Sequence, residues 1–307
     1  MAAEPKMRTI IPKEIPVPEL HQYLVGSVAP RPIAFASTMS KEGVPNLAPY
    51  SFFNCFGSNP PTLIFSSNRR VTGNTTKDTL HNVEATGEVV INVVTHSFIR
   101  QMTLASISYP EEVSEFEKSG LTPIESLKVK PYRVKESPVQ FECKVKQILP
   151  LGEEGGAGNL IICNVELLHI NEAVFDEKGK IDPQKMDLMG RMGRAFYVRA
   201  HGSNIMKFYQ PYNVLGVGFD QLPENLRHSP VLTGNELAYI AALEMLPSPK
   251  ECEEEMEDMI VKEIASRFAN DPEGLTYNLH QYARDLIKEN RVDKAARVLL
   301  LPHHKLL

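Results

Sequence analysis

Between residues 27 and 170 the chain alternates short apolar runs with turn-forming residues, and this pattern predicts β-strands. The apolar runs that predict strands in the first hundred residues are 32–38, 47–56, 62–66 and 88–94. Glycine and proline in the gaps, as in the GSNPP sequence after Phe56, mark turns. Residues 77–86 differ, because Leu80 and Val83 share one face of a helix and Gly87 suits its carboxyl-terminal cap.

The clearest strand signal begins at Val139, from which apolar and polar residues alternate strictly through Lys146. This period of two predicts a strand with one buried face and one face in water. A glycine-rich segment at 152–158 separates it from a second apolar run at 160–170, and together they predict an antiparallel hairpin. Antiparallel strands with little helix between them indicate a barrel or sandwich and not a doubly wound parallel sheet.

After about residue 221 the apolar period changes to that of helices. The apolar residues of two predicted helices, spaced by three or four, are Met256, Ile260, Ile264 and Phe268, and then Leu275, Leu279, Tyr282 and Leu286. An Asn-Asp-Pro turn at 270–272 separates these helices, and residues 237–245 and 292–300 predict two more. The sequence therefore predicts a mainly β domain over 1–220 and a C-terminal helical extension over 221–307.

The composition is that of an ordinary soluble globular protein. Of the 307 residues, 42% are hydrophobic and 23% charged, and 33 basic against 38 acidic side chains give a net charge of −5. This balance argues against a nucleic-acid partner held by bulk positive charge. The apolar runs are far shorter than the roughly 18 residues that cross a bilayer, and residues 1–26 lack the apolar segment of a signal peptide. We therefore expect no membrane partner and a cytoplasmic location.

The cysteines and histidines give no sign of a disulfide framework or a metal site. The four cysteines, Cys55, Cys143, Cys163 and Cys252, form no CxxC pair and lie among apolar residues, which predicts reduced core thiols. The sequence leaves open whether Cys143 and Cys163 face one another across the hairpin. The nine histidines include no pair at helical ligand spacing, so we expect no bound metal.

The stretch from Ser66 to Thr79 gathers the groups that bind a phosphate. Positive charges and hydroxyl donors flank a loop that leads into the predicted helix at 77–86, and they are Ser66, Ser67, Arg69, Arg70, Lys77 and Thr79. The free N–H groups and the positive dipole end of that helix favour a dianion. The alternative interpretation is a polar loop in which Asp78 or Thr76 only caps the helix.

Two segments upstream, RPIAFAST at 31–38 and NLAPYSFFN at 46–54, are rich in small residues and prolines. Small side chains let a flat aromatic ligand lie against backbone amides and carbonyls. The alternative interpretation is ordinary barrel core, in which Ala and Ser leave room for larger neighbours.

Five segments in order resemble the flavin reductase-like family of FMN-binding split barrels, the group that includes flavoredoxins. The segments are SVAPRPIAFAST, PNLAPYSFFN, NPPTLIFSSNR, KDTL followed by Asn82, and GEVVIN. The resemblance covers roughly residues 8–200. It implies a homodimeric, antiparallel, Greek-key-like split β-barrel with FMN near the subunit interface, so that two copies complete each site. It leaves the helical extension without a role.

The resemblance also implies roles for individual residues. The phosphate contacts would be Ser66, Ser67, Arg69, Lys77 and Thr79, and the contacts to the flavin ring and ribityl chain would be Arg31, Pro32, Ile33, Asn46, Ala48, Tyr50 and Ser51. His169, the candidate catalytic residue, and Phe196 or Tyr197 match positions near the cofactor, and edge-strand or packing roles are the alternatives. Family members that reduce free flavin for a monooxygenase commonly have histidine just before the strand at 160, where this chain has Asn159.

The function that the resemblance implies is that of an FMN-dependent oxidoreductase. NADH or NADPH would supply hydride, and a small molecule or an electron-acceptor protein would receive the electrons, with the flavin providing the redox chemistry. One alternative is a flavoredoxin-like electron carrier with no nicotinamide reaction. The other is a non-catalytic FMN-binding module whose helical extension binds a partner.

Overall fold

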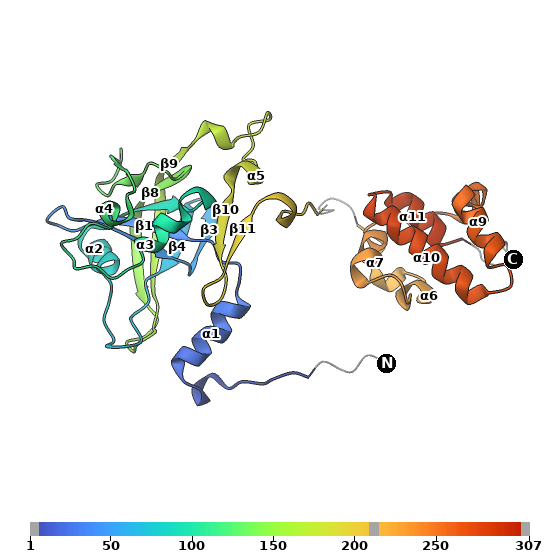
Figure 1. Ribbon diagram of the computed structural model, residues 1–307, viewed down its shortest axis with the longest axis horizontal. Coiled ribbons are helices and arrows are strands. Elements are labelled where there is room, and N and C mark those ends of the chain that lie inside the picture. The colour runs from blue at the N-terminus through green and yellow to red at the C-terminus, as the bar shows by residue number, and fades with distance from the viewer. Residues whose placement is uncertain (1–5, 209–214, 302–307) are drawn as a thin grey trace. The chain divides into compact units, whose positions relative to one another are not determined.

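The computed structural model describes residues 6–208 and 215–301, and the chain divides into two compact units. The first unit is Met1–Met206 and the second is Lys207–Leu307 (Figure 1). The division therefore falls earlier than the boundary at 220 that the sequence predicts.

The reason for the earlier division is that the segment before the first C-terminal helix already contacts the helical unit. The backbone N–H groups of Val217 and Gly218 donate to the carbonyls of Leu243 and Ala241. These hydrogen bonds attach the segment to the second unit, although its sequence shows no helical period.

The first unit is built on one seven-stranded antiparallel sheet in the order β2-β1-β5-β8-β9-β4-β3. Its strands are β1 (Ala34–Met39), β2 (Pro45–Tyr50), β3 (Phe53–Ser58), β4 (Pro61–Ser66), β5 (Glu88–Val93), β8 (Val139–Pro150) and β9 (Asn159–Ile170). Two short hairpins lie outside this sheet, β6 (Pro123–Ile124) with β7 (Arg133–Val134) and β10 (Leu188–Arg191) with β11 (Tyr197–Ala200). The predicted mainly β, antiparallel fold is confirmed.

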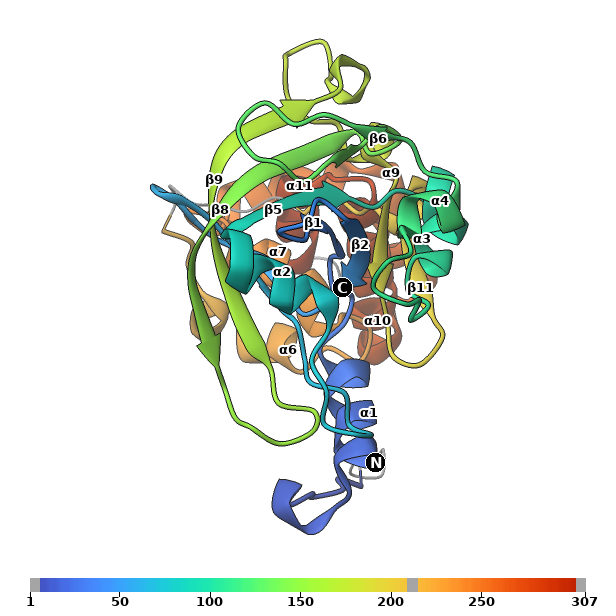
Figure 2. The same ribbon diagram turned by 90° about the vertical axis from the view of Figure 1, so that its left-hand side faces the viewer.

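The sheet curls on itself, because its two edge strands are consecutive in the chain. β2 ends at Tyr50 and β3 begins at Phe53, so that only Ser51 and Phe52 connect the opposite ends of the strand order. A flat seven-stranded sheet would hold these edges roughly 29 Å apart, at about 4.8 Å for each step between strands, which is far beyond the reach of two residues. Figure 2 shows the resulting barrel-like curvature.

The same turn makes one strand prediction wrong. Residues 47–56 are predicted as a single strand, but they contain the end of β2, the turn and the start of β3. The apolar residues continue through the turn into β3, although no residue of β3 is buried. The other predicted strands and the β8–β9 hairpin are confirmed, with ends shifted by a residue or two except in β8, which continues beyond Lys146 to Pro150.

The helices of the first unit are short, and they are η1 (Pro12–Glu14), α1 (Val17–Ser27), α2 (Asp78–Thr86), η2 (His96–Phe98), α3 (Ile99–Leu104), α4 (Glu115–Ser119), η3 (Glu172–Val174), α5 (Pro183–Met186) and η4 (Gly202–Asn204). Of these short helices, α2, α3 and α4 pack against strands of the curled sheet. The predicted helix at 77–86 is α2, and Gly87 ends it at a φ of 68°, a left-handed conformation that glycine adopts without strain. Leu80 and Val83 of α2 pack with Phe65 in the core of the barrel.

The prediction of a water-facing side for the first half of β8 is wrong. Gln140 is 6% exposed and Glu142 is 0% exposed. Residues 125–134 cross this face and supply the partners, since Gln140 donates to a carbonyl of that segment and Glu142 accepts the N–H of Leu127. A register shift follows Glu142, and only beyond it does Lys144 reach water. A strict period of two does not reveal that a loop covers the polar face.

The second unit is a helical bundle with its own hydrophobic core. Its helices are η5 (Phe219–Gln221), α6 (Glu224–Arg227), α7 (Gly234–Ala241), α8 (Pro249–Glu254), η6 (Glu255–Glu257), α9 (Met259–Arg267), α10 (Pro272–Lys288) and α11 (Val292–Leu299). The stripe predicted on α10 is confirmed, with Leu275 and Leu279 fully buried. The prediction of a single helix over 256–268 is wrong, because η6 ends at Glu257 and α9 begins at Met259. The Asp258 side chain caps α9 by accepting the N–H of Ile260 and Val261.

Three of the four cysteines are buried free thiols, but Cys55 is exposed on β3, where the prediction of a core thiol is wrong. Cys143 and Cys163 share one core without a disulfide, and burial raises the pKa of Cys163 to about 12. Among the described residues, no helix has the length and apolar character needed to cross a membrane. The same residues contain no group of three or more His, Cys, Asp or Glu placed to hold a metal ion.

Candidate functional site

A cavity of about 80 Å³ opens beside edge strand β2, between that strand, the start of α2 and the segment that follows α3. Predicted site residues that line it are Asn46, Ala48, Tyr50, Lys77 and Thr79. Arg70, which belongs to the local phosphate pattern, also lines it, as do Pro49, residues 105–109 and the two acidic residues Asp78 and Glu115. Parts of the chain that are far apart in sequence therefore meet at one edge of the sheet.

A buried polar network fixes the start of α2 against β1 and β2. The Asn46 amide donates to the hydroxyls of Thr38 at 3.0 Å and Thr79 at 2.9 Å. The Asn82 amide, one turn further along α2, donates to the same Thr38 hydroxyl at 3.1 Å. All four side chains are buried, and their bonds hold Asn46 and Thr79 in place at the cavity wall.

Lys77 brings an unpaired positive charge to the cavity. Its Nζ lies 5.0 Å from the centre of the Tyr50 ring, and among the described residues no carboxylate forms an ion pair with it. Burial lowers the pKa of Lys77, and the charge of nearby Arg70 lowers it further. A partly buried cation without an ion-pair partner is costly, so Lys77 favours an anion beside it.

Two neighbouring hydroxyls are buried: that of Tyr50, which lines the cavity, and that of Ser67, which does not. Burial raises the pKa of the Tyr50 phenol, although the neighbouring Thr79 and Ser67 side chains act against this rise. Among the described residues, neither the Tyr50 nor the Ser67 hydroxyl makes a hydrogen bond that satisfies distance and angle. Orphaned donors beside an unpaired cation match the acceptor-rich, doubly charged phosphate of a monoester, so these residues fit such a group.

Like Ser67, two other predicted phosphate contacts do not line the cavity, and both bind elsewhere in the chain. The Ser66 hydroxyl donates to Asn68 Oδ1 at 2.8 Å, and Arg69 donates to the side chain and carbonyl of Asn74 at 2.6 and 2.8 Å. Asn159 donates to the Ser67 carbonyl at 2.9 Å and so supports the backbone of this loop. The structure brings Lys77, Thr79 and Tyr50 together but directs Arg69 away from them.

Glu115 is a cavity residue that sequence reasoning missed. It comes from α4, is 7% exposed, and its Oε2 accepts the backbone N–H of Leu47 at 2.9 Å. Burial raises the pKa of Glu115, and the hydrogen bond from Leu47 acts against this rise. No sequence signal identifies it, because an acidic residue in a short polar helix resembles an ordinary solvent-exposed position.

The predicted ring contacts before β1 lie outside the cavity. Ile33 is buried in a hydrophobic core. The Arg31 guanidinium donates to the carbonyls of Val25 and Val28, each at 2.5 Å, and lies 3.5 Å from the Ser51 hydroxyl. Arg31 therefore holds α1 to the barrel, while Pro32 and Ser51 are not among the lining residues.

Tyr197 also lies outside the cavity, at the start of β11. The Arg191 guanidinium lies 4.5 Å from the centre of its ring, and Phe196 next to it is 61% exposed. The turn that carries these residues contacts Arg31, which donates to the Met192 carbonyl at 3.1 Å.

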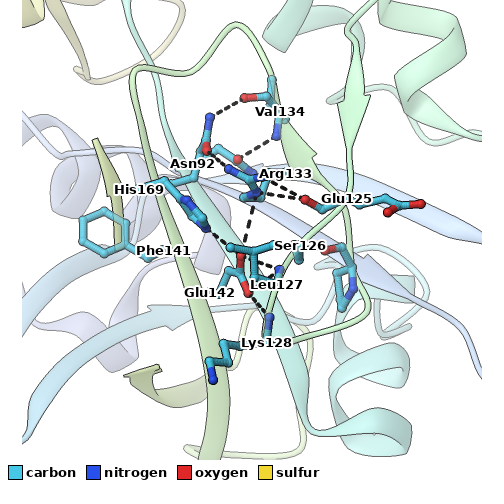
Figure 3. Close-up of polar contacts among 12 residues, drawn as sticks. Asn92, Glu125, Ser126, Leu127, Lys128, Arg133, Val134, Phe141, Glu142 and His169 are labelled. Atoms are coloured by element: carbon cyan, nitrogen blue, oxygen red, sulfur yellow. Dashed lines mark hydrogen bonds and ion pairs between the residues drawn. The ribbon is translucent and has the colours of Figure 1, made fainter. Parts of the chain in front are cut away.

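His169 is held by a buried carboxylate and does not line the cavity. Its Nε2 lies 2.7 Å from Glu142 Oε1, and the N–H groups of Leu127 and Lys128 donate to the same carboxylate (Figure 3). Burial alone would raise the pKa of Glu142, but these hydrogen bonds together hold it below its ordinary value. His169 is nine residues along β9 from Leu160, the partner of Ser66, which is a path of roughly 30 Å along the strand.

The similarity to known proteins lies mainly within the first unit of the chain. A family model described as flavin reductase like domain matches residues 26–187. An uncharacterized protein of Aquifex aeolicus is 38% identical over 195 residues, which cover 64% of this chain and 97% of that protein. The matched relative therefore has little beyond the region that corresponds to the first unit.

Solved structures show the same fold. Nitrilotriacetate monooxygenase component B from Bacillus cereus is 32% identical, with a TM-score of 0.61 over 67% of this chain and 100% of that one. The 2-nitrobenzoate 2-nitroreductase NbaA from Pseudomonas fluorescens is 25% identical, with a TM-score of 0.60 over 69% of this chain and 100% of that one. The predicted split barrel is confirmed by these similarities and by the strand order.

Proposed function

The chain belongs to the flavin reductase-like family, and from this premise we propose that it is an FMN-dependent oxidoreductase that takes hydride from NADH or NADPH. When bound, FMN supplies the redox chemistry, and the protein supplies binding, orientation and exclusion of water. The physiological acceptor is either a small organic molecule or an electron-acceptor protein.

The observation that carries this proposal is the unpaired Lys77 beside the ring of Tyr50, whose buried hydroxyl, like that of the neighbouring Ser67, lacks a hydrogen-bond partner among the described residues. Its position is just before the first residue of α2, where free backbone N–H groups and the helix dipole favour an anion. Lys77 and Arg70 together match the two negative charges of the FMN phosphate. Thr79, held by Asn46, is the further hydroxyl of this phosphate site.

The remaining cavity residues have roles in orienting the flavin. Ala48 has a small side chain at the cavity wall, so a flat ring can approach the backbone of β2. Glu115, which accepts the N–H of Leu47, keeps that backbone in position. None of these roles requires a side chain to transfer a proton, since hydride transfer to and from flavin needs only correct placement.

A second copy of the chain is part of this proposal. The cavity of about 80 Å³ is smaller than the roughly 300–1,000 Å³ of small-molecule pockets, so one chain encloses only part of the cofactor. His169 and Tyr197 lie outside the cavity of their own chain, and a homodimer provides a way for such residues to reach the flavin of a partner subunit.

The two named relatives support an oxidoreductase and illustrate both kinds of acceptor. One is a component of a monooxygenase, and the other is a nitroreductase. By analogy, the electrons of this protein pass to a partner protein or to an organic compound.

The test of the proposed function is spectroscopic. The protein, reconstituted with FMN and freed of unbound flavin, is expected to keep the flavin absorption band and to lose it on anaerobic mixing with NADH or NADPH. Flavin retention without bleaching by either nucleotide would refute the reductase and leave the electron carrier and the non-catalytic module as the alternatives. Failure to retain FMN would show that the assignment of the phosphate site is wrong.

A non-catalytic module that binds a partner through its helices is the second candidate, and the separate core of the helical unit favours it. A chain ending at Met206 is expected to bind FMN as tightly as the full chain, because the cavity residues all belong to the first unit. Fluorescence titration of both proteins with FMN, after circular dichroism has shown that the shortened chain is folded, measures this. An affinity loss of tenfold or more in a folded shortened chain would assign the helical unit to the flavin site.

A further inference from the structure

Three arginines meet where the turn between β10 and β11 touches α1. They are Arg31, Arg191 and Arg194, and within the described part of the chain no carboxylate forms an ion pair with any of them. Arg199 on the same hairpin shows the contrast, because it donates to both oxygens of Asp187 at 2.6 and 2.9 Å. The turn therefore carries positive charge that the protein does not neutralise.

Arg31 fixes the position of this turn. It is 6% exposed, and its guanidinium joins two carbonyls at the end of α1 to the carbonyl of Met192 in the turn. A backbone bridge between Arg31 and Arg191 adds a second attachment, with N–H to carbonyl distances of 2.9 and 2.8 Å. Arg191 and Arg194, the two outer arginines, thus extend from a turn whose backbone is already held in place before any ligand binds.

The outer arginines lie on aromatic rings. The Arg191 guanidinium is 4.5 Å from the centre of the Tyr197 ring and donates to the Arg194 carbonyl at 2.7 Å. The Arg194 guanidinium is 5.8 Å from the centre of the Phe196 ring, and Phe196 is 61% exposed. These contacts orient the planar N–H groups and leave an aromatic face open to solvent.

This combination matches one class of ligand. A guanidinium binds phosphate through paired N–H groups, and an exposed aromatic ring stacks on a purine base. A nicotinamide dinucleotide contains both features, since its phosphates connect it to an adenine. We propose that Arg191 and Arg194 bind the phosphate groups of NADH or NADPH and that Phe196 stacks on the adenine, an inference that rests on the proposed function.

The position of the turn agrees with this assignment. Arg31 Nε lies 3.5 Å from the Ser51 hydroxyl, and Ser51 directly follows Tyr50 of the cavity wall. Arg31 thus connects the turn to the segment that follows the cavity wall, while Arg191 and Arg194 do not line the cavity, as a site for the non-reacting part of the reductant requires. The net charge of −5 makes nucleic acid a weaker candidate for the same arginines.

The experiment compares the FMN-loaded wild-type protein with the double variant Arg191→Gln/Arg194→Gln. Calorimetric titration with NAD⁺ and with NADP⁺, which do not reduce the flavin, measures dinucleotide binding without any turnover. We expect the double variant to bind at least tenfold more weakly, with a smaller salt dependence, and to retain FMN at wild-type affinity. The charge-matched control is Arg100→Gln/Lys178→Gln, which removes two exposed cations elsewhere in the first unit and is expected to bind like wild type.

The outcomes separate this inference from the proposed function. Unchanged dinucleotide affinity in the double variant, or no binding to the wild-type protein, would overturn the inference even if NADPH still bleaches the flavin. Loss of FMN from the double variant would also overturn it, because the arginines would then belong to the flavin site. Dinucleotide binding that depends on the arginines, in a protein whose flavin neither nucleotide reduces, would support the inference and refute the proposed reductase.

Discussion

Lys77→Ala is expected to weaken FMN binding by roughly ten- to a hundredfold without unfolding the protein. A hydrogen bond to a charged group contributes about 1.5–3 kcal/mol, and about 1.4 kcal/mol corresponds to a factor of ten in affinity. Lys77 forms no ion pair among the described residues, so its removal breaks none in the apoprotein and relieves a desolvation cost. The FMN dissociation constant from fluorescence quenching and the melting temperature of the apoprotein measure the two parts of this prediction.

Arg69 and Arg70 provide a matched comparison for this variant. Arg70→Ala is expected to weaken FMN binding as well, because Arg70 lines the cavity. Arg69→Ala is expected to change the dissociation constant less than about threefold, because its guanidinium donates to Asn74 outside the cavity. Wild-type affinity in Lys77→Ala, or a larger loss in Arg69→Ala than in Lys77→Ala, would contradict the site as we describe it.

Glu142→Ala is expected to lower the free energy of unfolding by about 3–5 kcal/mol. The carboxylate is 0% exposed, and its loss leaves the N–H groups of Leu127 and Lys128 and the ring of His169 without their acceptor. Urea denaturation at neutral pH measures the change. Glu166→Ala, which removes an exposed carboxylate from β9, is the control, with an expected change within about 0.5 kcal/mol. A Glu142→Ala protein as stable as the Glu166→Ala control would show that residues 125–134 are held by other contacts.

The contribution of Glu142 is also expected to depend on pH. Its pKa is lower in the folded protein than the ordinary glutamate value of about 4.3, because the hydrogen bonds outweigh the effect of burial. The stabilisation is therefore fully present above that ordinary value and is lost as the pH falls through the lower folded value. The difference in unfolding free energy between wild type and Glu142→Ala is expected to shrink below about pH 4. A difference that stays constant down to pH 3 would contradict this linkage.

The sequence predicts those parts of the fold where one period continues over several residues. The helix closed by Gly87 and the β8–β9 hairpin are examples, since their patterns arise from local conformation. The turn at Ser51 and Phe52 and the burial of Glu142 escape prediction for a different reason. Both depend on where a distant part of the sheet or a crossing loop lies, and a local pattern carries no such information.

The candidate site divides in the same way. Lys77, Thr79 and Tyr50 belong to short segments whose chemistry is visible in the sequence, and the structure places them together. The distinction between Arg69 and Arg70 depends on which way a loop turns. Glu115 reaches the site through a hydrogen bond to Leu47, 68 residues away, a contact that one sequence alone does not reveal.

The free edge of β2 has a consequence for how the protein avoids association with other chains. An exposed edge strand presents unpaired backbone groups on which a foreign strand can assemble, which is a common route to aggregation. Here α4 packs against this edge and its Glu115 carboxylate accepts the N–H of Leu47, so that this donor is covered and is not available to a foreign strand. This contact protects the edge of the sheet against the addition of a foreign strand. The neighbouring positions of β2 that line the cavity remain open to a small planar ligand.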